Sequence, residues 1–333
     1  MKTRKLGQFE VSAIGLGCMS MSQAYGKADI KESERALKRA LEIGYTFFDT
    51  ASVYGDGHNE ELIGRVLGPE RERFILASKC GIVARSGGGR GIDGRPETIK
   101  QTCEDSLRRL RTDVIDLYYL HRRDFNVPIE DSVGALAELA AEGKIRSIGL
   151  SEVSSVTLRR AQQVHPVTAV QSEYSLWTRN PEHRVLETCR ELGVAFVPFS
   201  PLGRAFLAGA IRDVDRDLEE NDLRRRMPRF QGRDFEDNLM LLKEFERIAR
   251  DNKCSMAQLA LAWILSRENG SLVPIPGTKH VKYVEENAAA VDLRISPGDL
   301  ARAGMIINAE TVSGPRYPAD SPVPVDEDET ESA

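Results

Sequence analysis

Residues 74–79, Phe-Ile-Leu-Ala-Ser-Lys, form a short and almost wholly apolar run that ends in a lysine. A run without polar alternation is typical of a parallel strand that is covered on both faces. Comparable short strand candidates recur at residues 13–16, 46–49, 114–120, 147–150, 168–171, 194–197 and 272–275. The sequence therefore predicts eight strands.

Helical patterns lie between these strands. Pro96 suits the first position of a helix, and Gly44 follows another helical pattern as a stop residue. We expect helices at about residues 31–42, from residue 96 onward, and at 129–141, 155–164, 183–192, 256–266 and 297–308. Strands that alternate with helices are parallel and joined by right-handed crossovers, and eight such units close into a barrel. The predicted fold class is α/β, a single (β/α)8 TIM barrel over residues 1–310.

The alternative is an open, doubly wound sheet, which needs a glycine-rich nucleotide-binding turn directly after a strand. Residues 89–94, Gly-Arg-Gly-Ile-Asp-Gly, match the pattern G-x-G-x-x-G but begin well after the strand that ends near Lys79. Residues 15–20, Gly-Leu-Gly-Cys-Met-Ser, follow a strand, but no clear helix opens behind them. We interpret the first segment as a flexible loop and the second as a turn at the barrel mouth, which disfavours a Rossmann fold.

Two segments lie outside the repeat. Residues 203–237, after the seventh strand, are rich in Arg, Asp and Glu and are too long for a tight connection, so we expect a loop with a function. Its arginines at 224–233 either close over bound phosphate groups or form a solvated charged surface. Residues 311–333 contain prolines followed by a run of acids, which predicts a loose, disordered acidic tail.

The composition excludes several classes of protein. The 333 residues are 41% hydrophobic and 29% charged, as in soluble globular proteins. Five acids at 326–331 account for the net charge of −5, and a neutral remainder argues against nucleic-acid binding. No apolar run is long enough to cross a membrane and none follows the basic first residues, so we expect a cytoplasmic protein without a membrane partner. Five scattered cysteines predict reduced thiols, and the histidines lack the spacing of metal ligands.

Polar residues follow the predicted strands at their carboxyl ends, where barrel enzymes carry their chemistry. Asp49, Lys79 and His121 end the second, third and fourth strands, and Tyr54 lies shortly after Asp49. A tyrosine with a pKa of about 10 is a poor acid at neutral pH unless a cation stabilises its phenolate. Lys79 can supply that cation, Asp49 can balance the lysine, and His121 can direct a substrate oxygen towards the tyrosine. This set can protonate a carbonyl oxygen as it gains a hydride, which a cofactor must supply.

Several segments resemble the aldo-keto reductase superfamily, and they cover residues 3–310 in the expected order. They are residues 15–17, 49–55, 78–79, 119–122, 149–151, 170–174, 198–203 and 275–279. The chain is most similar to the bacterial, yeast and plant branch that is related to potassium-channel β subunits. The resemblance implies a (β/α)8 barrel that binds NADPH or NADP+ extended across its mouth and reduces a small-molecule aldehyde or ketone to an alcohol.

The resemblance also implies roles for individual residues. Asp49, Tyr54, Lys79 and His121 match the catalytic tetrad, with Tyr54 as the proton donor in reduction. The implied cofactor contacts are Gly17, Met19 and Asp49; Ser151, Glu152 and Gln171 around the nicotinamide amide; Phe199, stacked on the nicotinamide, with Ser200, Pro201, Leu202, Gly203 and Arg204 along the pyrophosphate; and Gly277, Thr278, Lys279, Tyr283, Glu286 and Asn287 at the adenosine phosphate. Glu152 stands where many members have Asn, and Phe199 replaces a frequent Tyr or Trp.

The cluster of Lys279, His280 and Lys282 favours NADPH over NADH, because it lies where the ribose 2′-phosphate is expected. Other assignments stay open at this point. Tyr25, Phe125 and Trp177 either wall a substrate pocket or pack structurally. A cofactor-bound regulatory subunit with slow catalysis, like the channel β subunits, would carry the same tetrad as a reductase, and a homo-oligomer is possible in either case. The lack of a membrane partner in the sequence favours the enzyme.

Overall fold

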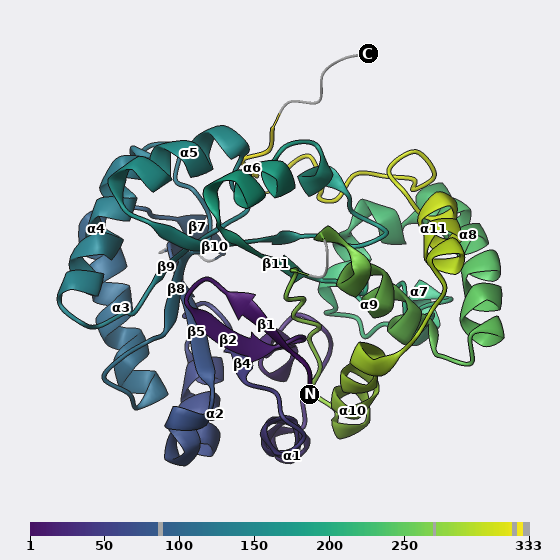
Figure 1. The fold of residues 1–333 in the computed structure, drawn as a ribbon, viewed down its shortest axis with the longest axis horizontal. Coiled ribbons are helices and arrows are strands. Elements are labelled where there is room, and N and C mark those ends of the chain that lie inside the picture. The colour runs from purple at the N-terminus through teal and green to yellow at the C-terminus, as the bar shows by residue number, and fades with distance from the viewer. Residues whose placement is uncertain (86–88, 269–270, 322–324, 329–333) are drawn as a thin grey trace.

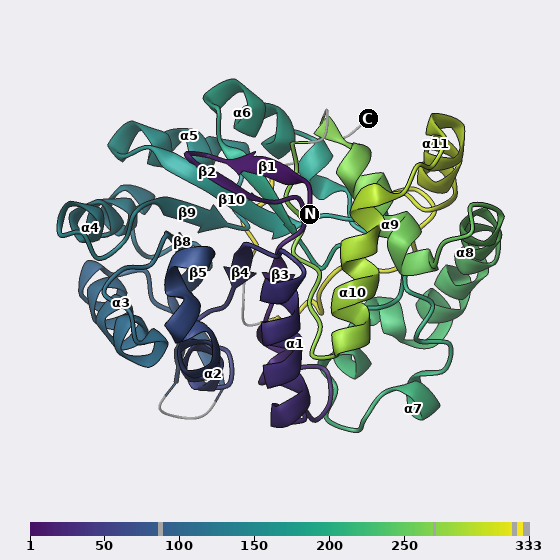
Figure 2. The ribbon, with the colours of Figure 1, turned by 60° about the horizontal axis from the view of Figure 1, so that its bottom comes forward.

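A computed structural model describes residues 1–85, 89–268, 271–321 and 325–328. Its centre is a sheet of seven parallel strands in the order β11-β10-β9-β8-β5-β4-β3. These strands are β3 (Leu16–Gly17), β4 (Phe47–Asp49), β5 (Ile75–Cys80), β8 (Leu117–Leu120), β9 (Ile148–Ser151), β10 (Val167–Glu173) and β11 (Ala195–Phe199). Figures 1 and 2 show helices around the outside of this curved sheet, which confirms the predicted TIM-barrel class.

The eighth predicted strand, at residues 272–275, closes the barrel without forming a regular strand. Parallel bridges join Phe199 to Ile275 and Gly17 to Gly277, so the segment lies between β11 and β3. Towards β11, this segment donates backbone hydrogen bonds from Val273 and Ile275. Pro274 and Pro276 have no N–H to offer β3, and there the bonds come only from the amides of Gly15 and Gly17. The alternating prolines explain why the pairing is incomplete.

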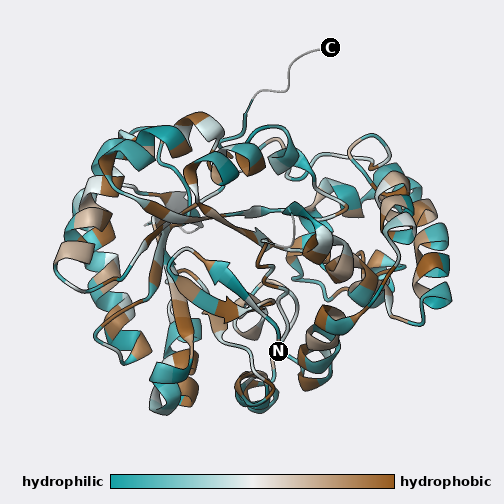
Figure 3. Ribbon diagram, in the orientation of Figure 1, coloured by the Kyte–Doolittle hydropathy of each residue, from teal (hydrophilic) through white to brown (hydrophobic). Residues whose placement is uncertain are grey.

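The helices bury one side against this sheet, and Figure 3 shows hydrophobic residues concentrated along the strands and on inward helix faces. Side-chain caps start several of them, as where Asp29 accepts from the amides of Lys31 and Glu32. The helices are α1 (Ile30–Glu42), α2 (His58–Leu67), α3 (Pro96–Leu110), α4 (Ile129–Ala141), α5 (Ser155–Val164), α6 (Val185–Leu192), α7 (Val214–Asp217), α8 (Gly232–Asp251), α9 (Met256–Ser266), α10 (Val281–Ala289) and α11 (Pro297–Ile306). The bounds predicted for α4, α5 and α9 are confirmed, whereas α2, α8 and α10 were not expected.

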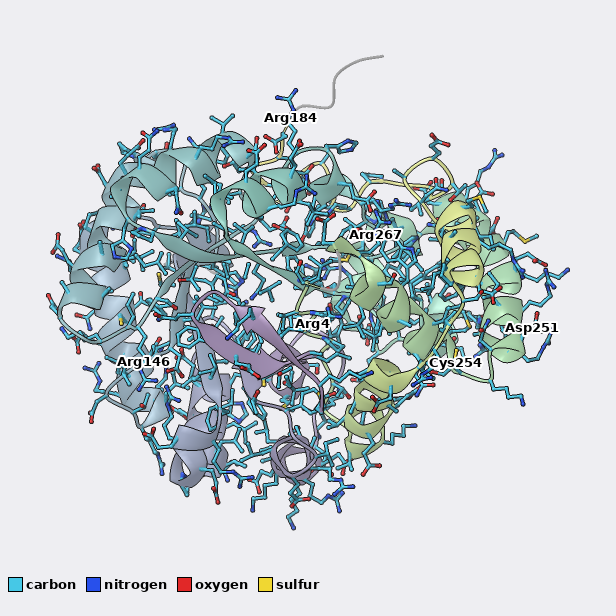
Figure 4. All side chains as sticks on the ribbon, in the orientation of Figure 1. Arg4, Arg146, Arg184, Asp251, Cys254 and Arg267 are labelled. Carbon is cyan, nitrogen blue, oxygen red and sulfur yellow. The ribbon has the colours of Figure 1, made fainter. Side chains whose placement is uncertain are left out.

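An antiparallel hairpin of β1 (Thr3–Leu6) and β2 (Phe9–Ser12), which the sequence did not reveal, covers the amino-terminal end of the barrel. Leu6 and Val11 are fully buried in the same cluster as Phe47 and Leu117 of the barrel strands. Arg4, labelled in Figure 4, holds the hairpin in place by donating from Nη2 to the carbonyl of Leu265 at 2.8 Å. The hairpin therefore closes the base of the barrel.

Two connections differ from the expected loops. The glycine-rich segment 89–94, expected to be a flexible loop, instead contributes β7 (Arg90–Ile92), which pairs antiparallel with β6 (Ile82–Ala84). The middle of that connection, residues 86–88, lies outside the described residues. The segment 203–237 contains α7, two 3-10 helices, η4 (Leu223–Arg226) and η5 (Pro228–Phe230), and the start of α8. Charged residues such as Asp222 end up capping these short helices.

The described part of the carboxyl-terminal segment packs against the barrel, unlike the loose tail that its composition predicts. Arg316, whose side chain is 9% exposed, donates from Nη2 to Glu152 at 2.8 Å and to Glu173 at 3.2 Å. Asp328 accepts from the amide of Ser155 at the start of α5. These partners sit on the barrel, far away in sequence, and so could not be read from the local pattern. Residues 322–324 and 329–333 lie outside the described residues, and the boundary at residue 310 stays a prediction.

None of the helices in the described ranges is both long and apolar enough to span a membrane.

Candidate active site

The carboxyl ends of neighbouring strands bring the predicted catalytic residues together. Asp49 is the last residue of β4, Lys79 lies near the end of β5, and His121 follows β8. Because β4, β5 and β8 are parallel and adjacent, these ends meet at one rim of the barrel. Tyr54 reaches the same rim from the turn before α2, where its carbonyl accepts from the amide of Asn59.

Lys79 is at the centre of the cluster and is completely buried. Its Nζ donates to Asp49 Oδ1 and, at 2.8 Å, to the carbonyl oxygen of Thr50. The same Nζ lies 3.4 Å from the hydroxyl of Tyr54. Asp49 accepts a second hydrogen bond, from Gln171 Nε2 at 2.8 Å. The ammonium is thus neutralised on one side and directed at the phenol on the other.

Tyr54 and His121 face each other edge to face, with ring centroids 5.8 Å apart and an interplanar angle of 80°. Each is 8% exposed, and both line one cavity. A small group between the two rings would therefore be within reach of a phenol O–H and an imidazole nitrogen together.

Burial dominates the ionisation of this cluster. It raises the pKa of Tyr54 above its usual value, although the neighbouring Lys79 ammonium acts in the opposite direction. Burial also lowers the pKa of His121 well below its usual value, and the positive charges of Lys79 and Arg122 add to this effect. The sequence had suggested a phenol made more acidic by lysine. The structure instead holds Tyr54 as a protonated phenol next to a neutral imidazole, which suits it to donate a proton.

The cavity at this rim has a volume of about 1310 Å³ and extends from the four-residue cluster to α10. Most of the residues implied as cofactor contacts line it, namely Gly17, Met19, Asp49, Ser151, Gln171, Phe199, Ser200, Pro201, Leu202, Arg204, Gly277, Thr278, Lys279, Tyr283, Glu286 and Asn287. Gly17 lies at a close approach of two chain segments, because a Cβ there would lie 2.9 Å from the carbonyl oxygen of Ile275.

Two residues implied as cofactor contacts are not among those that line the cavity. Glu152 is buried behind the rim, where it accepts hydrogen bonds from the amide of Glu173 and from Arg316. Its replacement of the more frequent Asn therefore serves an ion pair with the carboxyl-terminal segment. Gly203 faces Trp177, and a Cβ at position 203 would lie only 2.9 Å from Cε3 of the Trp177 ring.

The cavity suits an extended dinucleotide. Ser151, Gln171 and the flat face of Phe199 lie at the end near Tyr54, where a nicotinamide would need polar partners and a stacking surface. At the other end, Lys279 and Arg226 line the wall and form no ion pair within the described residues. Lys279 Nζ instead donates to the carbonyl oxygens of Tyr25 and Lys27, each at 2.8 Å. Cations without carboxylate partners fit phosphate groups.

Several cavity residues were missed or left open by the sequence. Tyr25 lines the cavity, whereas Trp177 is stacked on Phe206 in the core and Phe125 is 53% exposed at the surface. The wall also includes Arg122, which follows His121, and residues 317, 318, 320 and 321 of the carboxyl-terminal segment. Adjacency to His121 was the one available signal for Arg122. The terminal segment carried no signal for this position.

Comparisons with known proteins agree with the fold. The family model described as "Aldo/keto reductase family" matches residues 13–307. A probable aldo-keto reductase 1 of Glycine max is 43% identical over 318 residues, which cover 94% of this chain and 91% of that protein.

Solved structures extend this likeness to three dimensions. A glycerol dehydrogenase from Gluconobacter oxydans superposes with a TM-score of 0.83 at 28% identity, covering 96% of this chain and 98% of its own. An aldo/keto reductase from Klebsiella pneumoniae, solved in complex with NADP and acetate, gives a TM-score of 0.73 at 28% identity, covering 95% of this chain and 99% of its own. The chain therefore belongs to the aldo/keto reductase family.

Proposed function

We propose that this protein reduces aldehydes or ketones to alcohols with NADPH, and that Tyr54 donates the proton. Membership of the aldo/keto reductase family makes it an NADP-dependent oxidoreductase. The observation that carries the assignment of roles is the contact of 3.4 Å between Lys79 Nζ and the Tyr54 hydroxyl, inside a cavity large enough for a dinucleotide.

Each side chain of the cluster has a distinct task in this proposal. Tyr54 holds the proton that passes to the carbonyl oxygen, and the Lys79 ammonium stabilises the phenolate that is left. Asp49 fixes Lys79 and compensates its charge in the buried site. Neutral His121 donates a hydrogen bond to the same carbonyl oxygen and so orients it towards Tyr54. These residues act on charge that develops during the reaction, which is the basis of their catalytic effect.

The residues around the cluster fit the cofactor that the family implies. Bound NADPH would supply the hydride that the protein's own side chains cannot. Phe199 offers a ring face at the nicotinamide end, and Ser151 and Gln171 offer polar groups there. Lys279 and Arg226 would hold phosphates at the far end, and buried Asn287 with Glu286 would contact the adenine.

The test follows NADPH oxidation with 4-nitrobenzaldehyde in wild type and in Tyr54→Phe. Loss of the proton donor is expected to lower kcat by about 10²- to 10⁴-fold, with NADPH binding, measured by fluorescence titration, unchanged. Tyr118→Phe is the matched control, because it removes the hydroxyl of a fully buried tyrosine that does not line the cavity.

Equal turnover in Tyr54→Phe and wild type would refute the role of Tyr54. Tight NADPH binding with negligible turnover over a broad panel of aldehydes would favour a regulatory subunit over a reductase. We further propose a cytoplasmic location, because all five cysteines are present as free thiols in the structure.

A further inference from the structure

Arg122 is a buried cation without an anionic partner. The residue is 8% exposed. Its Nη1 donates to the carbonyl oxygen of His121 at 2.8 Å and to the hydroxyl of Ser151 at 3.1 Å, and both acceptors are neutral. Its Nε is buried and has no hydrogen-bond partner. A buried guanidinium normally has a carboxylate or another anion beside it, because burying an uncompensated charge is costly.

Two other arginines with largely buried side chains do have such partners. Arg204 pairs with Glu173, and Arg316 pairs with both Glu152 and Glu173. Asp124, the nearest acid to Arg122 along the chain, instead accepts from the backbone amides of Gly94 and Asn126. Of the described residues, none supplies a carboxylate in ion-pair contact with Arg122.

The position of Arg122 indicates where the missing anion would lie. Arg122 lines the cavity beside His121, and its Cζ is 6.0 Å from the centre of the Phe199 ring. The acid at this end of the cavity, Asp49, is already paired with Lys79. The positive charges of Lys79, Arg122 and Arg90 all act on His121, whose lowered pKa reflects them together with burial. The reacting end of the cavity is therefore electropositive, and this positive region is separate from the end that fits phosphates.

We propose that Arg122 is a specificity-determining residue that binds a carboxylate on the substrate, so that the preferred substrates are aldehydes or ketones that also carry a carboxylate group. This inference rests on the proposed function of the same site. The guanidinium would meet the carboxylate through charge-assisted hydrogen bonds while Tyr54 and His121 hold the carbonyl oxygen. The neutral bonds to His121 and Ser151 keep the guanidinium in place before the substrate arrives.

The experiment compares 4-carboxybenzaldehyde with methyl 4-formylbenzoate, which share the ring and the reacting aldehyde. The ester group withdraws electrons more strongly than the carboxylate, so intrinsic reactivity acts against the expected preference. With wild type and NADPH we expect kcat/KM to be at least about tenfold higher for the acid. Arg122→Gln is expected to lower kcat/KM for the acid by about 10- to 100-fold, chiefly through KM, and to change the ester by less than about threefold. Arg122→Lys, which keeps the charge but loses the planar fork, should fall between the two.

The outcomes separate this inference from the proposed function. Two results would overturn the inference and leave the proposed reductase function intact. In the first, wild type reduces both aldehydes without preference for the acid. In the second, Arg122→Gln lowers kcat/KM equally for both, which would mean that Arg122 only positions Ser151 and His121. If neither aldehyde is reduced, the proposed function fails. The inference is then decided by calorimetric binding of 4-(hydroxymethyl)benzoate to the protein with NADP+. Binding about tenfold weaker in Arg122→Gln supports it, and binding equal to that of wild type overturns it.

Discussion

Replacing Arg316 by methionine is expected to destabilise the protein strongly, although the residue lies in a segment whose composition suggests a loose tail. The Arg316 side chain is 9% exposed and pairs with Glu152 and Glu173, whose side chains are 1% and 5% exposed. Removing one partner of a buried ion pair leaves the other charge buried and uncompensated, which costs about 3–5 kcal/mol. Glu173 keeps Arg204 as a partner, whereas Glu152 loses its cation. We therefore expect a loss of about 3 kcal/mol in the free energy of unfolding, the lower end of that range.

Urea unfolding followed by circular dichroism measures this loss. Arg233→Met is the matched control, because the Arg233 side chain is 91% exposed and its substitution should leave stability unchanged. Adding Glu152→Gln to Arg316→Met removes the orphaned charge and should restore about 2 kcal/mol. A loss below about 1 kcal/mol in Arg316→Met, or no recovery in the double variant, would refute the reasoning.

The same network predicts a dependence on pH. Burial alone would raise the pKa of Glu173, but Arg316, Arg204 and Arg229 lower it to about 2. The depressed pKa gives stability that is fully present above the unfolded value of about 4.3 and is lost as the pH falls towards 2. In Arg316→Met the pKa of Glu173 should rise. Glu173 would then account for less of the stability that is lost as the pH falls from 4.5 to 2.

Three further predictions concern Lys79, His121 and the cysteines. Lys79→Met leaves Asp49 buried without its ammonium, so we expect loss of turnover together with about 3–5 kcal/mol of stability; full activity in a stably folded Lys79→Met variant would contradict the proposed role. His121, whose pKa is well below its usual value, should stay neutral at pH 6 in nitrogen NMR spectra, and its contribution to stability should be lost as the pH falls below about 6.5; an imidazolium signal at pH 6 would disprove this. Cys254, labelled in Figure 4, is the one partly exposed cysteine. Iodoacetamide should therefore label native protein at Cys254 and all five cysteines only after denaturation, as read by mass spectrometry.

The sequence was sufficient for features that depend on local patterns. Apolar runs placed the strands, and the polar residue at the end of each run placed Asp49, Lys79 and His121 at one rim. Helices α4, α5 and α9 had clear periodicity and the expected bounds. Tyr54 could be placed near Lys79 because it lies shortly after Asp49, at the end of the strand that precedes the strand of Lys79.

The sequence could not predict features that depend on distant partners. Arg316 and Glu152 are 164 positions apart, and neither local composition nor periodicity indicates that they meet. The sequence therefore did not indicate the ion pair between Glu152 and Arg316, and the cofactor contact of Glu152 stays a prediction. The pKa of Tyr54 was also misjudged, because the effect of burial depends on the packing around the ring and outweighs the neighbouring charge. The terminal hairpin escaped notice because its short strands mix charged and apolar residues.

The hairpin of β1 and β2 has a consequence for the order of events during turnover. The barrel interior is a packed core, and Leu6 and Val11 of the hairpin extend this core at the amino-terminal end. Within the described residues, ligands therefore reach Tyr54 through the cavity at the opposite rim. When two ligands enter a site through one opening, the ligand that binds deeper must bind first and dissociate last. This arrangement favours an ordered mechanism. The dinucleotide binds before the carbonyl compound, and the alcohol dissociates before the oxidised dinucleotide.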